Sequence, residues 1–379
     1  MKLSVIKGFD LKADLYRLEL DVAPEGFDLS SIETHSVEYF KKYGFRYSSL
    51  TSELFYRYNG IKSEKYIPAS LYYYYIVPYL IKMDFVHAYD DKCIYSKLFP
   101  NMKQPKTVMK NMNGRFYIPC ASSYNGEEEL TLNQAIEYLK SQEKSVIKPT
   151  MLGGGKGVQL YDFSENSEET IKELLKEYKS GFIIQRPVKN SDELKRLNPT
   201  SLNTCRIYTY RRVDSSEYVV LGSAIRFGGK GSFRDNACSG GGFCRINEDG
   251  RLDDTIYRYK FFEKGSLKHD KCIDCLFIPQ YDKMVECCLA LHRCLPYCDL
   301  VGWDITEDEE GDLILIEYNY AADSEFLQIF NGPAFGEYTD ELMEKLMQPI
   351  SEDMITIRRS FANAPEKSMV IDMKKVGDL

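Results

Sequence analysis

The sequence shows no long apolar run and no stretch that resembles a secretory signal, so we do not expect a membrane-spanning or exported protein. Its most apolar window, Ala69–Ile81, is too short to cross a bilayer and is interrupted by Pro78. The N-terminus meets Lys7 and Asp10 before any apolar run develops, so it does not resemble a signal peptide. We therefore expect a soluble cytoplasmic protein without a transmembrane segment.

Positive charge is also scarce relative to negative charge. The chain has 49 Lys and Arg residues against 57 Asp and Glu residues, a net charge of -8 and a pI near 5.3. This balance disfavours non-specific binding to nucleic acid or to anionic membranes, so we expect small molecules or proteins as partners. With 379 residues and 44% hydrophobic content, the chain can bury a large core and divide into two or three domains.

A disulfide framework is not indicated, because the eleven cysteines are odd in number and irregular in spacing. Cys272 and Cys275 form a CxxC, which with the later cysteines and His292 could be imagined as a zinc site. The later cysteines do not repeat the paired spacing, however, and they accompany residues at helical intervals: Met284, Cys288, Leu291 and Leu295. This pattern favours the buried face of a helix.

The stretch VIKPTMLGGGKGVQLYDF contains a glycine-rich loop of a kind that can hold phosphate. It is not a Walker loop, because Lys156 is followed by Gly157 and not by Ser or Thr. It is not a dinucleotide fingerprint either, because VQLYDF alternates like a strand and not like a helix. We predict a hairpin flap whose N–H groups at Gly154, Gly155 and Gly157 cover a polyphosphate beside Lys156. Many Gly-Gly hairpin turns bind nothing, and the loop alone leaves that alternative open.

Periodicity predicts strands and helices around this loop. A lysine-bearing, helix-like stretch ends before Pro105. The predicted elements are an extended strand TVMKNMNGRFYI, a helix capped by Thr131, a strand Ser145–Pro149, a helix from Ser167 and a strand GFIIQRPV. The end, MKKVGDL, is typical of a solvated tail.

Two arginines lie inside the polar strands that begin near Asn198. Arginine within a strand is costly unless its side chain reaches an anion or a carboxylate, so Arg206 and Arg226 are candidates for a phosphate site. The alternative is an exposed sheet face. A hairpin turn follows at Asn247–Arg251.

The stretch VGWDITEDEEGDLILIEYN reads as a hairpin with an acidic turn. If the turn is centred between Glu310 and Gly311, Asp304 lies opposite Glu317, with Cβ atoms roughly 4.5–5.5 Å apart, and Asn319 shares their face. Two such carboxylates repel each other unless a cation lies between them, and oxygen ligands of this kind suit Mg²⁺. A solvent-facing acidic hairpin is the alternative.

These segments, in this order, resemble the ATP-grasp superfamily. The resemblance covers Asp91–Asn319 through the motifs DK, VIKP before GGGKG, FIIQRPV, and WDI with IEYN. More narrowly, SLNTCRIYTY, RDN followed by SGGG, and VGWDI resemble the sugar-transfer-associated ATP-grasp group that is linked with cell-surface polysaccharide synthesis. The resemblance implies an α+β ATP-grasp fold that holds the nucleotide between two α+β subdomains, with ATP and Mg²⁺ as cofactors.

The resemblance also implies roles for individual residues. Lys92 and Lys148 would contact the nucleotide and its phosphates, and Arg206 and Arg226 would neutralise phosphate or acyl phosphate. The backbone at Gln185, Arg186 and Val188 would meet the adenine edge, and Asp192 would bind the ribose. Asp235 and Asn236 would position the acceptor or form a structural turn. One or two Mg²⁺ ions would be held by Asp304, Glu317 and Asn319. Many ATP-grasp ligases have Glu where this chain has Gln185.

We expect four segments in the chain: an N-terminal mixed α/β domain at 1–88, a central subdomain with the flap at 89–187, a C-terminal subdomain with the metal site at 188–350, and a helix or tail at 351–379. The resemblance implies a carboxylate–amine ligase that acts through an acyl phosphate on a surface polysaccharide or its sugar precursor. A kinase acting on a hydroxyl and a non-catalytic nucleotide-binding scaffold are the alternatives. The chain could form a homo-oligomer.

Overall fold

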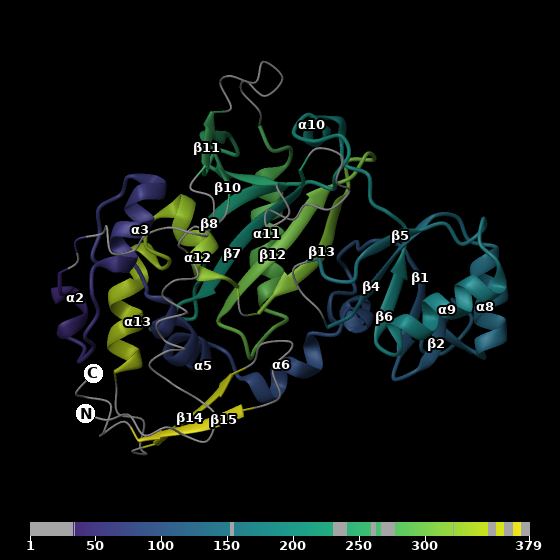
Figure 1. Cartoon of the computed structure of the whole chain (residues 1–379), viewed down its shortest axis with the longest axis horizontal. Coiled ribbons are helices and arrows are strands. Elements are labelled where there is room, and N and C mark those ends of the chain that lie inside the picture. Colours follow the sequence, from purple (N-terminus) through teal and green to yellow (C-terminus); the bar gives the residue numbers. More distant parts are fainter. Residues whose placement is uncertain are drawn as a thin grey trace. The chain divides into compact units, whose positions relative to one another are not determined.

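The chain forms two compact units, both discontinuous in sequence (Figure 1). The computed structural model describes residues 33, 35–151, 155–229, 241–258, 263–266, 277–320, 322–347, 354–359 and 367–372, with only the backbone for 263–266, 354–359 and 367–372. The first unit combines the residues up to Met83 with Glu193–Asp304 and the chain from Tyr318 onward. The second unit combines Asp84–Asp192 with Ile305–Glu317.

The second unit is built on a six-stranded sheet with the order β3-β2-β1-β6-β4-β5, in which all neighbours are antiparallel. The strands are β1 (Thr107–Met112), β2 (Arg115–Pro119), β3 (Glu127–Leu130), β4 (Ser145–Pro149), β5 (Gln159–Tyr161) and β6 (Phe182–Gln185). The hairpin of β4 and β5 is the predicted flap, so the strand after the glycines is confirmed.

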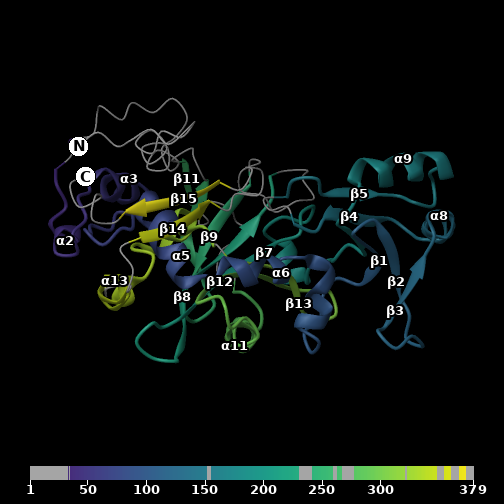
Figure 2. The same ribbon diagram turned by 90° about the horizontal axis from the view of Figure 1, so that it is seen from below.

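Two helices, α8 (Leu132–Lys140) and α9 (Glu168–Tyr178), cover one face of this sheet (Figures 1 and 2). Thr131 caps α8 in a capping box with Gln134, and the Ser167 hydroxyl accepts a hydrogen bond from the Thr170 N–H, as N-caps of this type do. Their apolar faces join a core with the sheet, which includes Ile136, Leu139, Ile171, Leu175, Ile147, Phe182 and Ile184. The predicted helices and the strand at Ser145–Pro149 are confirmed.

The predicted single strand TVMKNMNGRFYI is wrong, because the chain turns back at Asn113 and Gly114. Both residues have positive φ, 52° and 82°, and Met112 pairs with Arg115. A two-residue turn with positive φ at both positions matches the twist of a hairpin, and Asn-Gly is its preferred sequence. β1 and β2 are therefore two strands.

The acidic hairpin is confirmed, but its turn lies half a residue earlier than predicted. Asp308 faces Asp312, since the Asp308 N–H donates to the Asp312 carbonyl at 3.0 Å, and Gly311 takes the left-handed φ of 82° that closes the turn. The Asp308 carboxylate also accepts from the N–H groups of Glu310 and Asp312. The centre is therefore Glu310 and not the Glu310–Gly311 bond, so the predicted register that placed Asp304 directly opposite Glu317 does not follow from this turn.

The stretch before Pro105 contains short helices in the second unit. These are a 3₁₀ turn at Lys92–Ile94 and α7 (Tyr95–Leu98), preceded by α6 (Met83–Tyr89) at the boundary of the units. Asp91 caps the 3₁₀ turn, because its carboxylate accepts from the Cys93 N–H at 2.8 Å. The helix-like stretch is confirmed, although it forms two short pieces.

The first unit contains a seven-stranded sheet with the order β11-β10-β9-β8-β7-β12-β13. The strands are β7 (Thr204–Arg211), β8 (Tyr218–Phe227), β9 (Gly242–Ile246), β10 (Leu252–Arg258), β11 (Glu263–Ser266), β12 (Leu300–Glu307) and β13 (Leu313–Asn319). The division between the units runs through β12 and β13. The predicted turn at Asn247–Arg251 is confirmed, since the Asn247 N–H donates to the Arg251 carbonyl at 2.8 Å.

Helices pack around the sheet of the first unit. They are α2 (Glu38–Lys41), α3 (Leu50–Asn59), α4 (Ala69–Leu71), a π-helical segment (Tyr72–Ile76), α5 (Val77–Leu80), α10 (Asp192–Lys195), which begins at the boundary, α11 (Tyr281–His292), α12 (Ser324–Asn331), a 3₁₀ turn (Gly336–Tyr338) and α13 (Thr339–Leu346). α11 packs on β7 and β8, and α12 packs on β8, β9 and α3. No helix within the described ranges is both long and apolar enough to span a bilayer.

The cysteine-bearing helix α11 is part of the core. Its Met284 and Cys288 are buried, and His292 has both ring nitrogens engaged, one with the Thr209 hydroxyl at 2.8 Å and one with the Cys298 carbonyl at 2.9 Å. Burial lowers the pKa of His292 to about 4. The predicted buried helix face is confirmed, whereas Cys272 and Cys275 lie outside the described residues.

The expected C-terminal helix or tail is wrong for two segments. β14 (Met354–Arg359) and β15 (Lys367–Asp372) pair antiparallel as a two-stranded sheet. The β-branched residues in MITIRR and KSMVID favour strands over a helix. The end MKKVGDL lies outside the described residues.

Candidate functional site

The flap of the second unit is fixed at its returning end. The Tyr178 hydroxyl donates to the Gly157 carbonyl at 2.5 Å. Gly157 has a φ of 70°, and a Cβ there would lie 2.8 Å from Pro149 Cγ, so this position requires glycine. Gly155 also has a positive φ, and Lys156 is exposed. The loop therefore presents glycine backbone and a lysine, as predicted; Gly154 lies outside the described residues.

Lys92 connects Thr150, at the end of the strand that leads into the flap, to the acidic hairpin within the second unit. Its ammonium group is buried, donates to the Thr150 carbonyl at 3.3 Å, and forms an ion pair with Glu317 at 3.4 Å. Thr150 directly precedes the flap, so three predicted parts of the site, Lys92, the flap and Glu317, are brought together. A buried lysine needs such anionic and carbonyl partners.

Asp90 is a member of this group that the sequence did not reveal. Burial raises the pKa of Asp90 to about 7, with smaller contributions from Lys92, which opposes the rise, and from the carboxylates of Glu317 and Asp91. Only the tertiary burial could have identified it, since an Asp-Asp pair before a lysine is unremarkable in sequence.

Lys148 and Gln185 share the sheet face opposite α8 and α9. Val146 pairs with Gln185 and Lys148 with Ile183, and paired residues point to the same side. Gln185 is 6% exposed, and its Nε2 donates to the Pro105 carbonyl at 3.2 Å. Its Oε1 has no hydrogen-bond partner among the described residues. A buried acceptor of this kind suits a ligand donor.

The segment after Gln185 fits its predicted role less well. The Arg186 N–H donates to the Lys106 carbonyl at 2.8 Å, and the Arg186 guanidinium donates to Ser145 and Gln142. The Arg186 N–H is thus engaged with Lys106, and the contact of the backbone around Gln185 to Val188 with adenine stays a prediction. Val188 lies beyond β6 and is half-buried, and Asp192 is exposed at the start of α10.

In the first unit, Arg206 and Arg226 converge on Asp304. The Arg206 guanidinium binds the carboxylate in bidentate fashion at 2.6 and 2.8 Å, and Arg226 Nη1 reaches both oxygens at 3.1 Å. Arg206 is 9% exposed and Asp304 is 2% exposed, so the alternative of an exposed sheet face is wrong. The expectation that these arginines reach a carboxylate or an anion is confirmed, and the carboxylate is Asp304.

Asn319 joins the same cluster. Its Nδ2 donates to the Gly302 carbonyl at 3.3 Å and lies 3.4 Å from Asp304 Oδ2. Gly302 leaves room for Ala322 and for the Arg206 side chain, because a Cβ there would lie 2.9 Å from the Ala322 Cβ and 3.3 Å from the Arg206 Cδ. Asp304 and Asn319 are thus brought together within the first unit, as predicted.

The segment after Asn319 supplies neighbours that the sequence analysis missed. The Tyr72 hydroxyl donates to the Ala322 carbonyl, and the Tyr208 hydroxyl donates to the Asp323 carbonyl at 3.0 Å. Burial, followed by the nearby Asp323, raises the pKa of Glu325 well above its usual range. The acidic segment ADSE, which follows IEYN, was the available sequence signal for these neighbours. Nothing in its spacing indicated that Tyr72 would form a hydrogen bond with it.

The donor set of Asp304, Glu317 and Asn319 fits Mg²⁺ chemically. Two carboxylates and one amide supply hard oxygen atoms, and Asn319 Oδ1 makes no hydrogen bond with other described residues. Each oxygen of Asp304 accepts from Arg206 and from Arg226, so a metal ion bound there would replace one of these arginine contacts. Asp304 belongs to the first unit and Glu317 to the second, and a metal ion bound by both residues stays a prediction. Asp235 and Asn236 lie outside the described residues.

One protein family and several solved structures are similar to this chain. A sequence model of the sugar-transfer associated ATP-grasp family matches residues 75–342. Among solved structures, the chain is similar to D-cycloserine synthetase DcsG, with 14% identity over 70% of this chain and 73% of that one and a TM-score of 0.40. It is also similar to the VanG D-Ala:D-Ser ligase from Enterococcus faecalis, with 14% identity, coverage of 68% and 62%, and a TM-score of 0.39. No curated protein matches.

The two antiparallel sheets with their helices form an α+β fold of the ATP-grasp class. Because the family model matches more than half of its length, the chain belongs to the sugar-transfer-associated ATP-grasp family. The resemblance that the sequence motifs indicated is confirmed.

Proposed function

We propose that the protein is an ATP-dependent carboxylate–amine ligase that forms an amide through an acyl phosphate. Family membership supports ATP as the energy source, and the cluster of Arg206, Arg226 and Asp304 is the observation that carries the proposal. Asp304 meets both guanidinium groups, but two positive charges and one negative charge leave this cluster of three side chains with a net positive charge, which favours a further anion. The substrate carboxylate and its acyl phosphate are the anions that we assign to them in the reaction.

The second unit supplies the groups proposed for nucleotide binding. Lys92 and Lys148 contact the phosphates, and the flap with Lys156 covers them. Gln185 Oε1 accepts a hydrogen bond from the amino group of adenine. Mg²⁺ held by Asp304, Glu317 and Asn319 would neutralise charge on the phosphates.

The proposed reaction has two transfers. An oxygen of the substrate carboxylate attacks the γ-phosphorus, the bond from that phosphorus to ADP breaks, and an acyl phosphate forms. The amine nitrogen then attacks the acyl carbon and loses a proton while inorganic phosphate leaves. Arg206 and Arg226 stabilise the negative charge of both anions, and the flap excludes water, which would hydrolyse the acyl phosphate.

We propose a sugar acid as the acceptor, such as the uronic acid of a cell-surface polysaccharide or of its precursor. The family description, sugar-transfer associated, supports a saccharide substrate. An amino acid or another amine completes the amide. Neither the relatives nor their substrates identify the amine.

The test is ADP release with a panel of uronic acids and amines in the presence of ATP and Mg²⁺. With hydroxylamine as the trapping nucleophile, a ligase gives a hydroxamate of the correct acid together with ADP. A stable phosphorylated alcohol would instead identify a kinase and contradict the ligase. ATP binding without turnover across the panel would identify a scaffold.

A further inference from the structure

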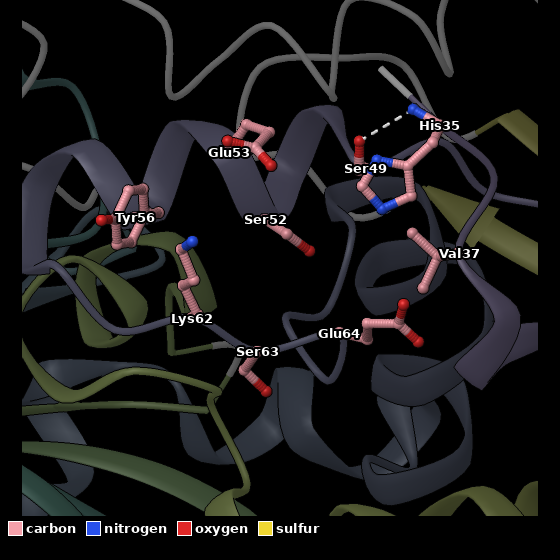
Figure 3. Close-up of a pocket in the computed structure, with 9 residues that line it drawn as sticks. All are labelled: His35, Val37, Ser49, Ser52, Glu53, Tyr56, Lys62, Ser63 and Glu64. Carbon is pink, nitrogen blue, oxygen red and sulfur yellow. Dashed lines mark hydrogen bonds between the residues drawn. The ribbon is translucent and has the colours of Figure 1, made fainter. Parts of the chain in front are cut away.

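A pocket of about 430 Å³ lies in the first unit, away from every residue assigned to the ligase (Figure 3). It is formed by α3, the segment from His35 to Val37 and the segment from Lys62 to Glu64. Its volume falls within the range of roughly 300–1,000 Å³ that is usual for small-molecule sites. All its residues precede residue 75, where the family match begins, so family membership does not account for it.

The walls of the pocket are held in place by packing and hydrogen bonds. Val37 and Ser49 are 1% and 2% exposed. The His35 N–H donates to the Ser49 hydroxyl at 3.0 Å, and the Ser49 N–H donates to the His35 carbonyl at 2.8 Å. On the far side of α3, Phe55 stacks on Tyr66 with ring centroids 5.2 Å apart. The cavity is therefore part of the folded framework.

Several polar side chains point into the pocket without a protein partner (Figure 3). Within the described part of the chain, the Glu53 carboxylate and the Ser52 hydroxyl make no hydrogen bond or ion pair, and the Lys62 ammonium makes no ion pair. Glu64 uses one oxygen, Oε2, to accept from the Tyr39 N–H at 3.2 Å. Donors and acceptors thus surround the cavity, and they suit a ligand that both donates and accepts hydrogen bonds.

The charges and the apolar surface narrow the class of ligand. Two carboxylates, Glu53 and Glu64, against one ammonium, Lys62, disfavour phosphate or another anion. Hydroxyl groups can donate to the carboxylates and accept from the ammonium. The Tyr56 ring, 38% exposed, and Val37 add apolar surface that the C–H face of a pyranose can cover.

We propose that this pocket binds a neutral saccharide, at a site separate from the ATP-grasp chemistry. The proposal is carried by Glu53 and Ser52, which have no partner among the described residues, beside Lys62, whose ammonium lies 5.5 Å from the centroid of the Tyr56 ring. It does not depend on the ligase, because binding here needs neither nucleotide nor metal.

The test is saturation-transfer NMR with D-glucose, D-galactose and N-acetyl-D-glucosamine at millimolar concentration, without ATP or Mg²⁺. We expect transfer to at least one of them, with dissociation constants from titration. Glu53→Gln should weaken binding about tenfold, because it removes a hydrogen bond to a charged acceptor, and Tyr56→Ala should abolish the signal. Circular dichroism confirms that both variants are folded.

Matched controls are Glu143→Gln and Tyr124→Ala, which alter an exposed carboxylate and an exposed tyrosine of the second unit. They should leave binding unchanged. Absence of transfer to all three saccharides, or transfer that both pocket variants leave intact, overturns the proposal. So does pocket-dependent binding of alanine, glucuronate or inorganic phosphate in place of the neutral sugars. None of these results bears on ADP release, so the ligase is tested separately.

Discussion

At the scale of single residues, Asp304 and Glu317 differ in how much each carboxylate contributes to the stability of the fold. Asp304 is buried and holds two guanidinium groups in close contact. Glu317 is partly exposed, and its ion pair with Lys92 is longer, 3.4 Å. Removing one partner of a buried charge cluster leaves the other charges uncompensated. Lys92 is buried too, but it also donates to the Thr150 carbonyl, so the loss of Glu317 should cost less than the loss of Asp304. Variants of the two proposed metal ligands should therefore lose similar activity but different amounts of stability.

We expect Glu317→Gln to lower ADP release about 100-fold or more and to destabilise the fold by only about 1–2 kcal/mol, because Lys92 keeps the Thr150 carbonyl as a partner. Asp304→Asn should lower turnover similarly but also destabilise the fold by about 3 kcal/mol. Steady-state kinetics and urea unfolding measure both. Glu309→Gln, on the exposed tip of the same hairpin, is the control. Full activity in Glu317→Gln would remove it from the metal site.

Gln185 offers a test of base preference. Its Nε2 is held by the Pro105 carbonyl, so its Oε1 is the atom available to a base. The amino group of adenine can donate to this oxygen, whereas guanine presents an acceptor in the same place. Gln185→Leu should weaken ATP binding about tenfold and leave the weaker GTP binding unchanged. Calorimetric titration of ATP and GTP into the natural protein and the variant measures these affinities. An equal loss of affinity for ATP and GTP would contradict a contact with the base.

At the scale of elements, the flap depends on two different features of glycine. Gly157 needs both a positive φ and the absence of a Cβ, because Pro149 lies 2.8 Å from where the Cβ would be. Gly126 has a similar φ of 75° but no atom within 4 Å of its Cβ position. Substituting each of the two glycines therefore distinguishes the cost of backbone strain, which both share, from the cost of a steric clash, which only Gly157 has.

We expect Gly126→Ala to cost about 1 kcal/mol through its φ alone and Gly157→Ala to cost about 1 kcal/mol more. Gly157→Ala should also raise the KM for ATP, because the flap no longer closes in the same position. Urea unfolding and ATP titration provide the readouts. Equal destabilisation in the two variants would show that the Pro149 contact relaxes without cost.

At the scale of the whole molecule, the first unit joins segments that are far apart in the sequence. Asp340 on α13 accepts hydrogen bonds from Tyr39 and Tyr43 and forms an ion pair with Lys65 at 2.7 Å. The Lys65 bond comes first among the causes that hold the pKa of Asp340 well below its usual range. On the sheet, Trp303 and His292 meet at the Thr209 hydroxyl. The stability of this unit should therefore depend on pH through groups from several elements.

His292 gives that dependence a direction. Burial lowers its pKa from 6.5 to about 4, so the unfolded state binds more protons between these values. The stability that neutral His292 contributes is complete above about pH 6.5 and is lost as the pH falls toward 4, by about 3 kcal/mol in total. Urea unfolding of His292→Gln should show a pH dependence smaller by this amount than that of the natural protein. Protonation of the His292 ring near pH 6.5 in an NMR titration would contradict this expectation.

Local signals determined several elements without the tertiary structure. The Thr131 cap, the alternation after the glycines and the glycine at the acidic turn each act within a few residues, so periodicity and turn chemistry were enough to place them. The Asn113–Gly114 turn was equally local, and it was missed because the apolar residues on both sides continued the strand pattern.

The sequence by itself determined the ATP-grasp class, the flap and the arginines that need an anion, because motif order and strand patterning are local properties. Only the tertiary structure decided that Asp304 is the carboxylate between Arg206 and Arg226, that Lys92 meets Glu317, and that a polar pocket forms beside α3. The reason is physical: these contacts join residues that many others separate along the chain, and burial, which selects the partner of a charge, exists only once the sheets have formed.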